Sequence, residues 1–230
     1  MAEKVARSEN TTTPEVRVTF PNIFKCRSYQ GGKPAKDITL LFDKKNEEHK
    51  TWLRGFKAQI DAVLAEQWPD PKDRPRRCVW GDDTYPIKDA DKNKNQKGIP
   101  FAESYPERAG HFFIKAVKYP NDSNPNADMP IVDSHKAEIL NAGEIYSGCY
   151  CKVNLNCSAR TRTDNPGISV WLNGVQKIKD GERIGGGGGP SVDDMFEASG
   201  SDDPLSYNAG EKDFFSEPGA AKQEEKDFFS

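Results

Sequence analysis

The segment from Glu144 to Arg160 (EIYSGCYCKVNLNCSAR) alternates two sets of residues with opposite chemistry, which is typical of a β-strand with one buried face. The inward set is small and mostly apolar: Ile145, Ser147, Cys149, Cys151, Val153, Leu155, Cys157 and Ala159. The outward set is aromatic, basic or hydrogen-bonding: Tyr146, Tyr150, Lys152, Asn154, Asn156, Ser158 and Arg160. Such a strand indicates a β-rich fold with one sheet face exposed to solvent.

Further strand patterns cover five segments of the chain: residues 15–20, 24–29, 38–42, 111–119 and 168–179. In the first of these, Val16, Val18 and Phe20 form an apolar face. Pro21 then interrupts the run, since proline cannot donate to a strand ladder. We therefore expect the first strand to end at residue 20.

The strand pattern that begins at residue 111 places Phe113, Lys115 and Tyr119 on its outer side. Later in the chain, Asn173–Gly174 has the composition of a two-residue hairpin turn, and Asp180–Gly181 has that of another. The last strand region is thus expected to fold back on itself twice.

One helix is predicted over residues 46–68, because its apolar residues recur at spacings of three and four. Asn46 suits the N-cap and Pro69 ends the helix. The same spacing assigns Trp52 and Trp68 to core packing rather than to base stacking. Many short strands with one main helix predict a mainly β fold, an OB-fold-like five-stranded barrel.

A long irregular insertion, residues 69–110, is rich in proline, charge and asparagine. Long loops inside a compact domain are usually functional or mobile. Its basic residues include Arg74, Arg76, Arg77, Lys92, Lys94 and Lys97. An arm that embraces DNA and a merely solvated loop both remain open for this segment.

Charge and composition divide the chain into four parts. We expect a flexible N-terminus (1–14), a folded domain (15–184), a glycine linker (185–190) and an acidic disordered tail (191–230). Residues 191–230 carry eleven acids and three lysines, a net charge of −8, whereas residues 1–190 are at +5. A basic body beside an acidic tail points to nucleic-acid contact by the body.

An outer face that interleaves aromatic rings with cations suits single-stranded DNA, because unpaired bases stack on rings while Lys or Arg meet the phosphates. Duplex DNA hides its base faces, so such a surface selects single strands without reading sequence. The candidate DNA-binding residues are Tyr146, Tyr150, Lys152, Asn154, Arg160, Arg162, Phe113, Lys115, Trp171, Lys177, Lys179, Lys25 and Arg27. The alternative is that Tyr146 and Tyr150 cover a secondary core.

Metal and catalytic alternatives are weaker. Cys149, Cys151 and Cys157 lie on the inward face without zinc-ligand spacing, and the histidines are isolated along the sequence. A metal-dependent nuclease would have to use loop acids, namely Asp82, Asp83, Asp89, Asp91 and Glu103. We therefore expect a non-catalytic protein with no cofactor and no metal; a protein-interaction adaptor is the other alternative.

The acidic tail repeats the sequence EKDFFS at residues 211–216 and 225–230. Paired phenylalanines among acids are typical of a short docking peptide, which needs an apolar anchor and charges that steer it to a basic pocket. The expected partner-binding residues are Phe214, Phe215, Asp227, Phe228 and Phe229.

No stretch of the sequence is apolar enough to span a membrane, and the N-terminus lacks an apolar signal segment. Five cysteines make an odd count, which favours reduced thiols. The expected location is the cytoplasm, with no membrane partner.

Over residues 14–197 the chain resembles bacteriophage single-stranded DNA-binding proteins, a family whose domain was long catalogued as one of unknown function. The resemblance is carried by GEIYSGCYCKVNLN (143–156), LNGVQKIKDGERIGG (172–186) and DDMF (193–196). It implies an OB-fold, binding without base-sequence preference, and a role in phage DNA replication and recombination within an infected bacterial host. It also implies that the tail engages replication proteins such as polymerase or helicase/primase. Pairing of two copies into a homodimer stays open.

Overall fold

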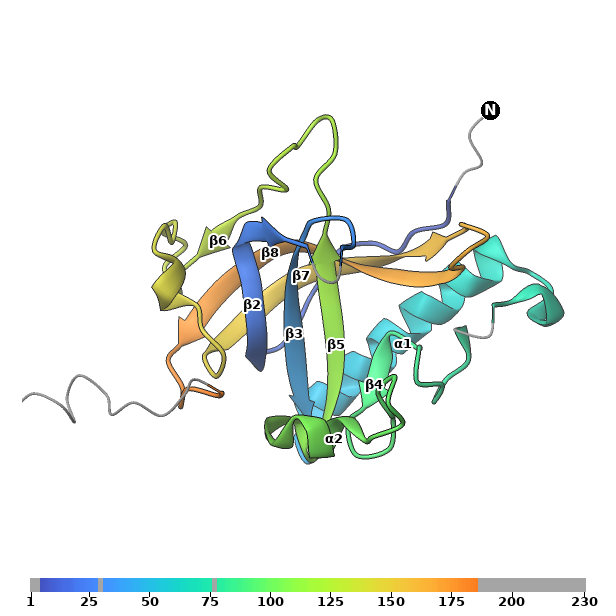
Figure 1. The fold of residues 1–230 in the computed structure, drawn as a ribbon, viewed down its shortest axis with the longest axis horizontal. Helices are drawn as coiled ribbons and strands as arrows, with labels where there is room; N and C mark the ends of the chain where they lie inside the picture. Colours follow the sequence, from blue (N-terminus) through green and yellow to red (C-terminus); the bar gives the residue numbers. More distant parts are fainter. Residues whose placement is uncertain (1–4, 29–30, 76–77, 186–230) are drawn as a thin grey trace, which may run out of the picture. The chain divides into compact units, whose positions relative to one another are not determined.

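The protein is described here by a computed structural model over residues 5–28, 31–75 and 78–185. Strands dominate this part of the chain (Figure 1). Their bounds are β1 Thr11–Thr12, β2 Val16–Arg27, β3 Ala35–Asp43, β4 Ile87–Asp89, β5 His111–Lys118, β6 Ile131–Val132, β7 Tyr150–Arg160 and β8 Gly167–Lys179. The helices are α1 Glu47–Gln67 and α2 Phe101–Ser104, with short 3-10 turns η1 Pro71–Asp73, η3 Pro106–Arg108 and η4 Ala142–Glu144.

Five strands form a ring of successive pairings. β7 pairs with β2, β2 with β3, and β3 with β5, all antiparallel. β5 then meets β8 through one parallel bridge between Val117 and Trp171, and β8 pairs along its length with β7. The remaining strands extend this ring at β7, β5 and β8. The expected fold class, mainly β with one main helix, is confirmed over the described residues.

The long helix α1 begins where the sequence predicts. The Asn46 side chain accepts hydrogen bonds from the backbone N–H groups of Glu48 (2.9 Å) and His49 (3.3 Å), which are among the donors that a helix start leaves unpaired. The helix ends before Pro69. Among the described residues, no helix has the length and apolar character that crossing a membrane would require.

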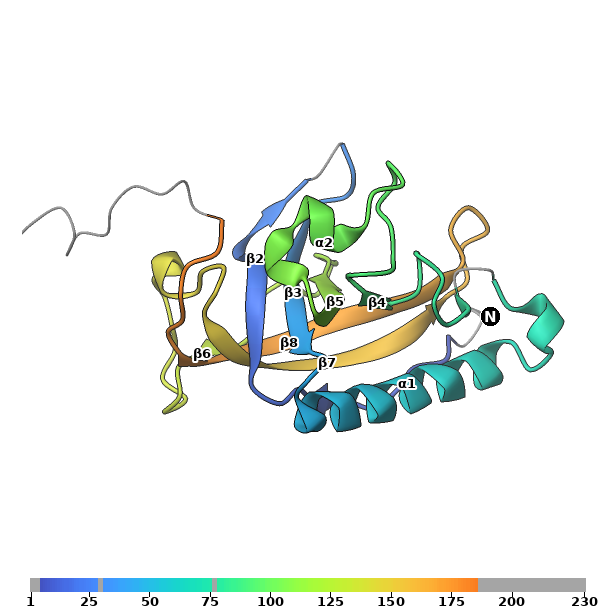
Figure 2. The ribbon, with the colours of Figure 1, turned by 90° about the horizontal axis from the view of Figure 1, so that it is seen from below.

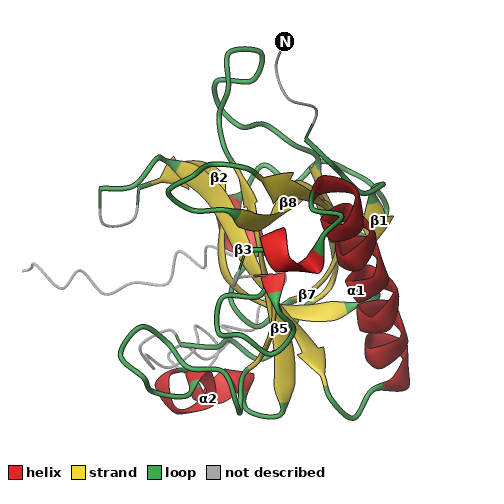
Figure 3. Cartoon of the chain, turned by 90° about the vertical axis from the view of Figure 1, so that its right-hand side faces the viewer, coloured by secondary structure: helices red, strands yellow, loops and turns green. Residues whose placement is uncertain are grey.

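The apolar side of α1 packs against β7 and β3 (Figures 2 and 3). Leu53, Phe56 and Ile60 are buried there. The Trp52 ring is stacked between Phe42, at 5.1 Å, and Phe56, at 5.0 Å between ring centroids. The expectation that Trp52 serves the core rather than a base platform is confirmed.

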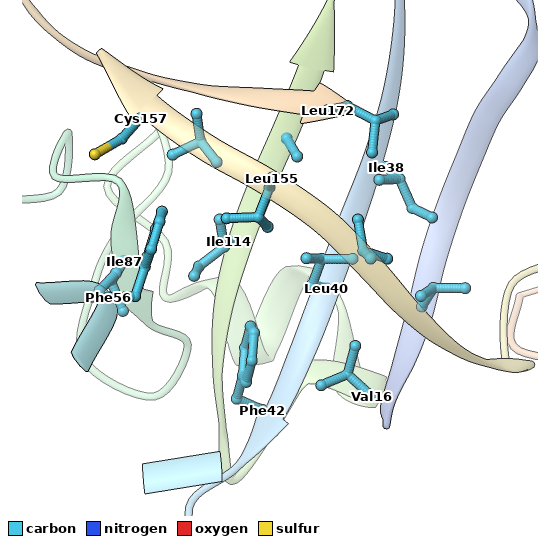
Figure 4. Close-up of a cluster of buried hydrophobic side chains, with 14 of the residues drawn as sticks. Val16, Ile38, Leu40, Phe42, Phe56, Ile87, Ile114, Leu155, Cys157 and Leu172 are labelled. Atoms are coloured by element: carbon cyan, nitrogen blue, oxygen red, sulfur yellow. The ribbon is translucent and has the colours of Figure 1, made fainter. Parts of the chain in front are cut away.

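The core fills the inside of the ring (Figure 4). The inward set of the β7 alternation lies there: Cys149, Cys151, Val153, Leu155 and Cys157 have no exposed surface. Side chains from β2, β3, β5, β8 and α1 meet them, among them Val16, Ile38, Leu40, Phe42, Phe56, Ile114 and Leu172. Each such side chain contributes about 1.5–3 kcal/mol by leaving water.

The insertion 69–110 is largely irregular, as expected, but it also adds β4 and α2 to the fold. Lys88 of β4 pairs with Phe113 of β5. The α2 segment lies on the opposite side of the strands from α1 (Figure 2). There Phe101 packs edge-on against Phe113, with ring centroids 4.9 Å apart, and covers a small cluster that includes Leu41.

The expected end of the first strand at residue 20 is wrong. β2 does not stop at Pro21 but continues to Arg27, because a register shift between Thr19 and Asn22 places the proline at an irregularity that needs no ladder donor. At this irregularity Phe20 takes a φ of +51° and turns its ring outward, 44% exposed, instead of joining the apolar face.

Neither expected hairpin turn exists. β8 runs without interruption through Asn173–Gly174, where a register shift opposite Asn154 and Leu155 absorbs the extra residue as a bulge. The β7–β8 connection is formed by residues 161–166 instead. After β8, the chain passes Asp180–Gly181 without pairing back on β8, and Ile184 N–H donates to Ser147 O at 2.8 Å.

Candidate nucleic-acid interface

The outward residues of β7 share one side of the β7–β8 ribbon with residues of β8. Tyr150 lies across from Lys179, Lys152 from Gln176, and Asn156 from Trp171. The alternation predicted from the sequence therefore holds along β7 from Tyr150 to Arg160.

In the middle of this outer face, polar side chains of β7 and β8 form hydrogen bonds with one another. Asn173 Nδ2 donates to Asn156 Oδ1 at 3.1 Å and to Asn154 Oδ1 at 3.3 Å. Trp171 Nε1 donates to Ser158 Oγ at 2.7 Å. Asn156 and Ser158 are consequently buried, and their role is to hold Asn173 and Trp171 in place.

A cleft of about 810 Å³ opens beside Trp171, between the end of β5, β8 and the β7–β8 connection. We call it the β5–β8 cleft. Four of the candidate residues line it: Lys115, Arg160, Arg162 and Trp171. Further lining residues include Lys33, Tyr119, Asn165 and Ser169. Segments far apart in sequence thus bring cations and rings together at one place.

Two aromatic rings stand in the β5–β8 cleft. Tyr119 and Trp171 meet edge-on, with ring centroids 6.1 Å apart and planes at 76°. Tyr119 is 37% exposed, and the Lys33 ammonium lies 5.8 Å from its ring centroid. An exposed ring with a cation beside it can stack a base and contact the adjoining phosphate.

The cations of the cleft are held by local acceptors. Lys115 pairs with Asp37 at 2.5 Å, and Arg162 pairs with Asp164 at 2.9 Å. Arg160 donates to the backbone and side-chain oxygens of Asn165 at 2.5 and 3.2 Å. The Arg162–Asp164 pair is largely exposed, so a phosphate can replace the carboxylate at little cost.

The opposite end of the ribbon corrects the expectation for Tyr146. This residue precedes a turn at Ser147–Gly148, outside β7, so the strand alternation does not extend to it. Its hydroxyl lies 3.0 Å from Asp180 Oδ1 and accepts from Gly181 N–H at 3.1 Å. The guanidinium of Arg183 lies 4.0 Å from its ring centroid, and the ring also packs against the core.

Tyr150 keeps its outward position, half-buried under Lys179, whose ammonium lies 4.8 Å from the ring. Lys179 pairs with Glu15 and Lys177 pairs with Asp180, both at 2.7 Å. The hydrogen bond from Lys177, followed by that from Tyr146, holds the pKa of Asp180 below its ordinary value. These contacts fasten the end of β8 to the body.

Phe113 is not accessible. Only 4% of it is exposed, because Phe101 and the Arg108 guanidinium, 4.7 Å from its ring centroid, cover it. The prediction that Phe113 presents a stacking ring is therefore wrong. Lys25 and Arg27 are exposed near the end of β2 and do not line the β5–β8 cleft.

Lys152 and Asn154 line a separate, shallower groove of about 430 Å³ together with Asn173 and Gln176. Two residues of the β5–β8 cleft, Tyr119 and Lys33, are not among the DNA-binding residues predicted from the sequence. The alternation of β5 signals Tyr119, since it shares the outer side of Lys115, whereas no periodicity marks Lys33, which lies in the β2–β3 loop.

The inward thiols form no ligand set. Cys149 and Cys151 have their sulfurs 3.7 Å apart in the core, and the described residues contain no group of three His, Cys, Asp or Glu side chains placed to hold a metal ion. The tail residues Phe214, Phe215, Asp227, Phe228 and Phe229 lie outside the described residues, as does the linker beyond Gly185.

A closed ring of five strands with loops flanking one exposed side is the architecture of oligonucleotide-binding folds, which bind along their second and third strands and the adjoining loops. The family model described as "Enterobacter phage Enc34, ssDNA-binding protein" matches residues 9–205. The chain therefore belongs to this family of phage single-stranded DNA-binding proteins, which are binding proteins and not enzymes. The resemblance noted from the sequence is confirmed.

Individual relatives are similar to this chain over most of its length. Protein p50 of Acyrthosiphon pisum secondary endosymbiont phage 1 is 25% identical over 189 residues, which is 80% of this chain and 91% of p50. The single-stranded DNA-binding protein of bacteriophage Enc34, solved in complex with ssDNA, is 22% identical with a TM-score of 0.58, over 80% of this chain and 97% of the other.

The single-stranded DNA-binding protein gp2.5 of bacteriophage T7 is 15% identical with a TM-score of 0.50, over 84% of this chain and 98% of its own. At these identities the solved structures support the fold.

Proposed function

We propose that this chain binds single-stranded DNA, without base-sequence preference, in the β5–β8 cleft. The observation that carries the proposal is the placement of Trp171 and Tyr119 in one cleft with four cations, Lys33, Lys115, Arg160 and Arg162. Membership of a family of phage single-stranded DNA-binding proteins supports it.

The chemistry of the cleft favours a single strand over a duplex. Every base has a flat face, so stacking on Trp171 or Tyr119 tolerates any sequence and is worth about 1–3 kcal/mol per base. A duplex keeps these faces stacked inside and offers only phosphates. Cations alone would bind both forms, so the discrimination comes from the rings.

The nuclease alternative finds no support in the acids of the insertion. Asp89 and Asp91 both bind Lys44. Asp83 accepts from Asn93 Nδ2 and from the Lys94 N–H. These carboxylates shape the insertion loop.

Titration of labelled oligo-dT and of a matched duplex with the full chain, followed by fluorescence anisotropy, tests the proposal. We expect tight binding of oligo-dT and of mixed-sequence single strands, and much weaker binding of the duplex. Equal affinity for duplex and single strand would reject stacking in the cleft, and no binding of either would reject the function.

We further propose that the protein acts in phage DNA replication and recombination inside the infected bacterium. The acidic tail would recruit a polymerase or a helicase/primase. The support is the EKDFFS sequence, present twice and offering apolar anchors among acids. Pull-down of the purified replication proteins by the full chain, compared with a chain ending at residue 190, tests recruitment; equal capture by both would contradict it. Light scattering of the full chain tests whether two copies pair into a homodimer.

A further inference from the structure

Arg108 ends η3 in an unusual position for a cation. It is only 6% exposed, and four aromatic rings surround its guanidinium. The centroids of these rings lie at 4.1 Å (Tyr105), 4.7 Å (Phe113), 5.5 Å (Phe20) and 5.9 Å (Phe101). Ring faces attract a cation, yet they do not replace hydrogen-bond acceptors.

Among the described residues, none forms a hydrogen bond or an ion pair with the Arg108 guanidinium, and its Nε is fully buried without a partner. Burial lowers the pKa of Arg108, and an arginine guanidinium keeps its charge in proteins. Buried charges in proteins are normally paired, because an unpaired one costs stability. A buried guanidinium without a paired acid indicates that the anion is supplied by a ligand.

Two exposed rings lie beside this cation. Phe20 is 44% exposed and Tyr105 is 36% exposed, and the two meet edge-on at 5.6 Å between centroids. Phe20 adopts a φ of +51°, in the left-handed region that non-glycine residues seldom occupy. Backbone strain of this kind is concentrated at functional sites. Here it holds an apolar ring in water above Arg108.

The position of this cluster relates it to the β5–β8 cleft. Phe113, which packs under Arg108, and Lys115, which lines the cleft, are two residues apart on the outer side of β5. Two residues of a strand span about 7 Å. The Lys88 ammonium, 6.0 Å from the Phe113 ring, adds a further cation on this side. A polyanion in the cleft that continues along β5 would next reach Arg108.

We propose that Phe20, Tyr105 and Arg108 form a second nucleotide subsite for the same DNA strand. A base stacks on the exposed Tyr105 or Phe20 ring, and the neighbouring phosphate accepts hydrogen bonds from the Arg108 guanidinium. The strand arrives from the β5–β8 cleft past Lys115. This inference rests on the proposed function and extends its binding path to the insertion, whose α2–η3 segment supplies two of the three residues.

The test compares variants over a ladder of oligo-dT lengths, from about 4 to 16 nucleotides, the range of site sizes known for this type of fold. The variants are Phe20→Gly and Tyr105→Ala in the full chain. Glycine suits the φ of residue 20, so the first substitution removes the ring while relieving backbone strain. Trp80→Ala is the matched control, since Trp80 is 49% exposed and also lies near a cation, Lys57.

We expect each subsite variant to weaken binding of the long oligonucleotides about 5- to 100-fold, and to leave the shortest ones unchanged because they are held by the cleft alone. The Trp80→Ala control should match the wild type at every length. Arg108→Lys should retain more affinity for long oligonucleotides than Arg108→Met, because the ammonium keeps the charge.

Unchanged affinity of both ring variants at every length, with weakened binding by Trp171→Ala, would overturn the subsite and leave the proposed function intact. If Trp171→Ala and Arg162→Gln also had no effect while the wild type bound oligo-dT, the β5–β8 cleft would fail as the binding site. Absence of DNA binding by the wild type would reject the proposed function itself. A labelled EKDFFS peptide tests whether the cluster binds a peptide instead of DNA. If the wild type binds this peptide, Tyr105→Ala abolishes that binding, and DNA affinity is unchanged, the cluster is a peptide site.

Photocrosslinking removes any dependence on the folding of variants. Wild-type full chain is irradiated with bromodeoxyuridine-substituted oligo-dT, and the adducts are mapped by mass spectrometry. Adducts at Phe20 or Tyr105 as well as in the cleft support the subsite. Adducts confined to the cleft residues overturn it.

Discussion

The indole N–H of Trp171 on β8 donates a 2.7 Å hydrogen bond to the hydroxyl of Ser158 on β7, which is itself buried. This bond fixes the edge of the indole against the ribbon and leaves the ring at the wall of the β5–β8 cleft. A fixed ring loses little conformational entropy when a base stacks on it.

Truncation of this ring should weaken DNA binding. We expect Trp171→Ala to reduce affinity for oligo-dT by about 1–3 kcal/mol, because it removes the stacking surface. Trp171→Phe should lose less, since a ring remains, although without the bond to Ser158. Anisotropy titration measures both, and Trp80→Ala is the control. A Trp171→Ala variant that binds like the wild type would remove Trp171 from the interface.

In the proposed interface, Asp164 would compete with DNA for Arg162. Its carboxylate holds the guanidinium at 2.9 Å and adds a negative charge to the cleft proposed to bind phosphates. Asp164→Asn should therefore strengthen binding of oligo-dT by about 2- to 5-fold, as expected for removal of an exposed ion-pair partner. Asp61→Asn, which breaks a partly exposed pair with Lys57 on α1, should leave DNA affinity unchanged. Weaker binding by Asp164→Asn would show that the carboxylate positions Arg162 for DNA.

Salt dependence counts the phosphate contacts. For single strands, the logarithm of the affinity falls by about 0.7 per contact for each tenfold rise in salt concentration. Arg162→Gln should reduce the slope by about that amount while the preference for single strands persists. Titrations at several NaCl concentrations give the slope. An unaltered slope would mean that Arg162 meets no phosphate.

Sequence alone located β7 and its two faces, because side chains alternate strictly while a strand stays regular. It failed at Tyr146, where the turn at Gly148 breaks the alternation, and at Phe20, where a bulge reverses the side on which the ring points. Local patterns do not show such interruptions in advance. They depend on how β2 must bend to pair with both β3 and β7.

Burial by distant segments was equally invisible in the sequence. Phe113 follows the outward pattern of β5, yet the insertion folds Phe101 and Arg108 over it. The β5–β8 cleft is assembled from the β2–β3 loop, β5 and the β7–β8 connection, so Lys33 and Tyr119 become neighbours only in the folded chain. The residue types of the site were foreseeable, but their grouping was not.

Stability in acid should depend on Asp91. The hydrogen bond from Lys44, followed by that from the Gly110 N–H, holds the pKa of Asp91 below its ordinary value of 3.8. Its stabilising contribution is therefore complete above about pH 4 and is lost as the pH falls through the lowered pKa. Asp91→Asn should destabilise the protein by at most about 1 kcal/mol at neutral pH, because the pair is partly exposed, and by nothing at the acid end. Urea unfolding at several pH values measures the difference in unfolding free energy between the wild type and Asp91→Asn. A difference that stays constant with pH would contradict this linkage.

The position of residues 182–184, which follow β8, depends on Gly148. This residue has a φ of +114°, and a Cβ built on it would lie 2.0 Å from the carbonyl oxygen of Glu182, a backbone atom that cannot move aside alone. Gly148→Ala must therefore displace residues 182–184, together with the bond from Arg17 to Glu182 O at 2.7 Å. We expect a loss of roughly 2–4 kcal/mol of unfolding free energy.

Gly55→Ala is the matched control, because its Cβ would meet nothing within 4 Å on the surface of α1. There the same substitution should add about 0.5–1 kcal/mol. Thermal and urea denaturation of the two variants decide the matter, since equal stability of Gly148→Ala and the wild type would mean that the segment packs differently against the turn.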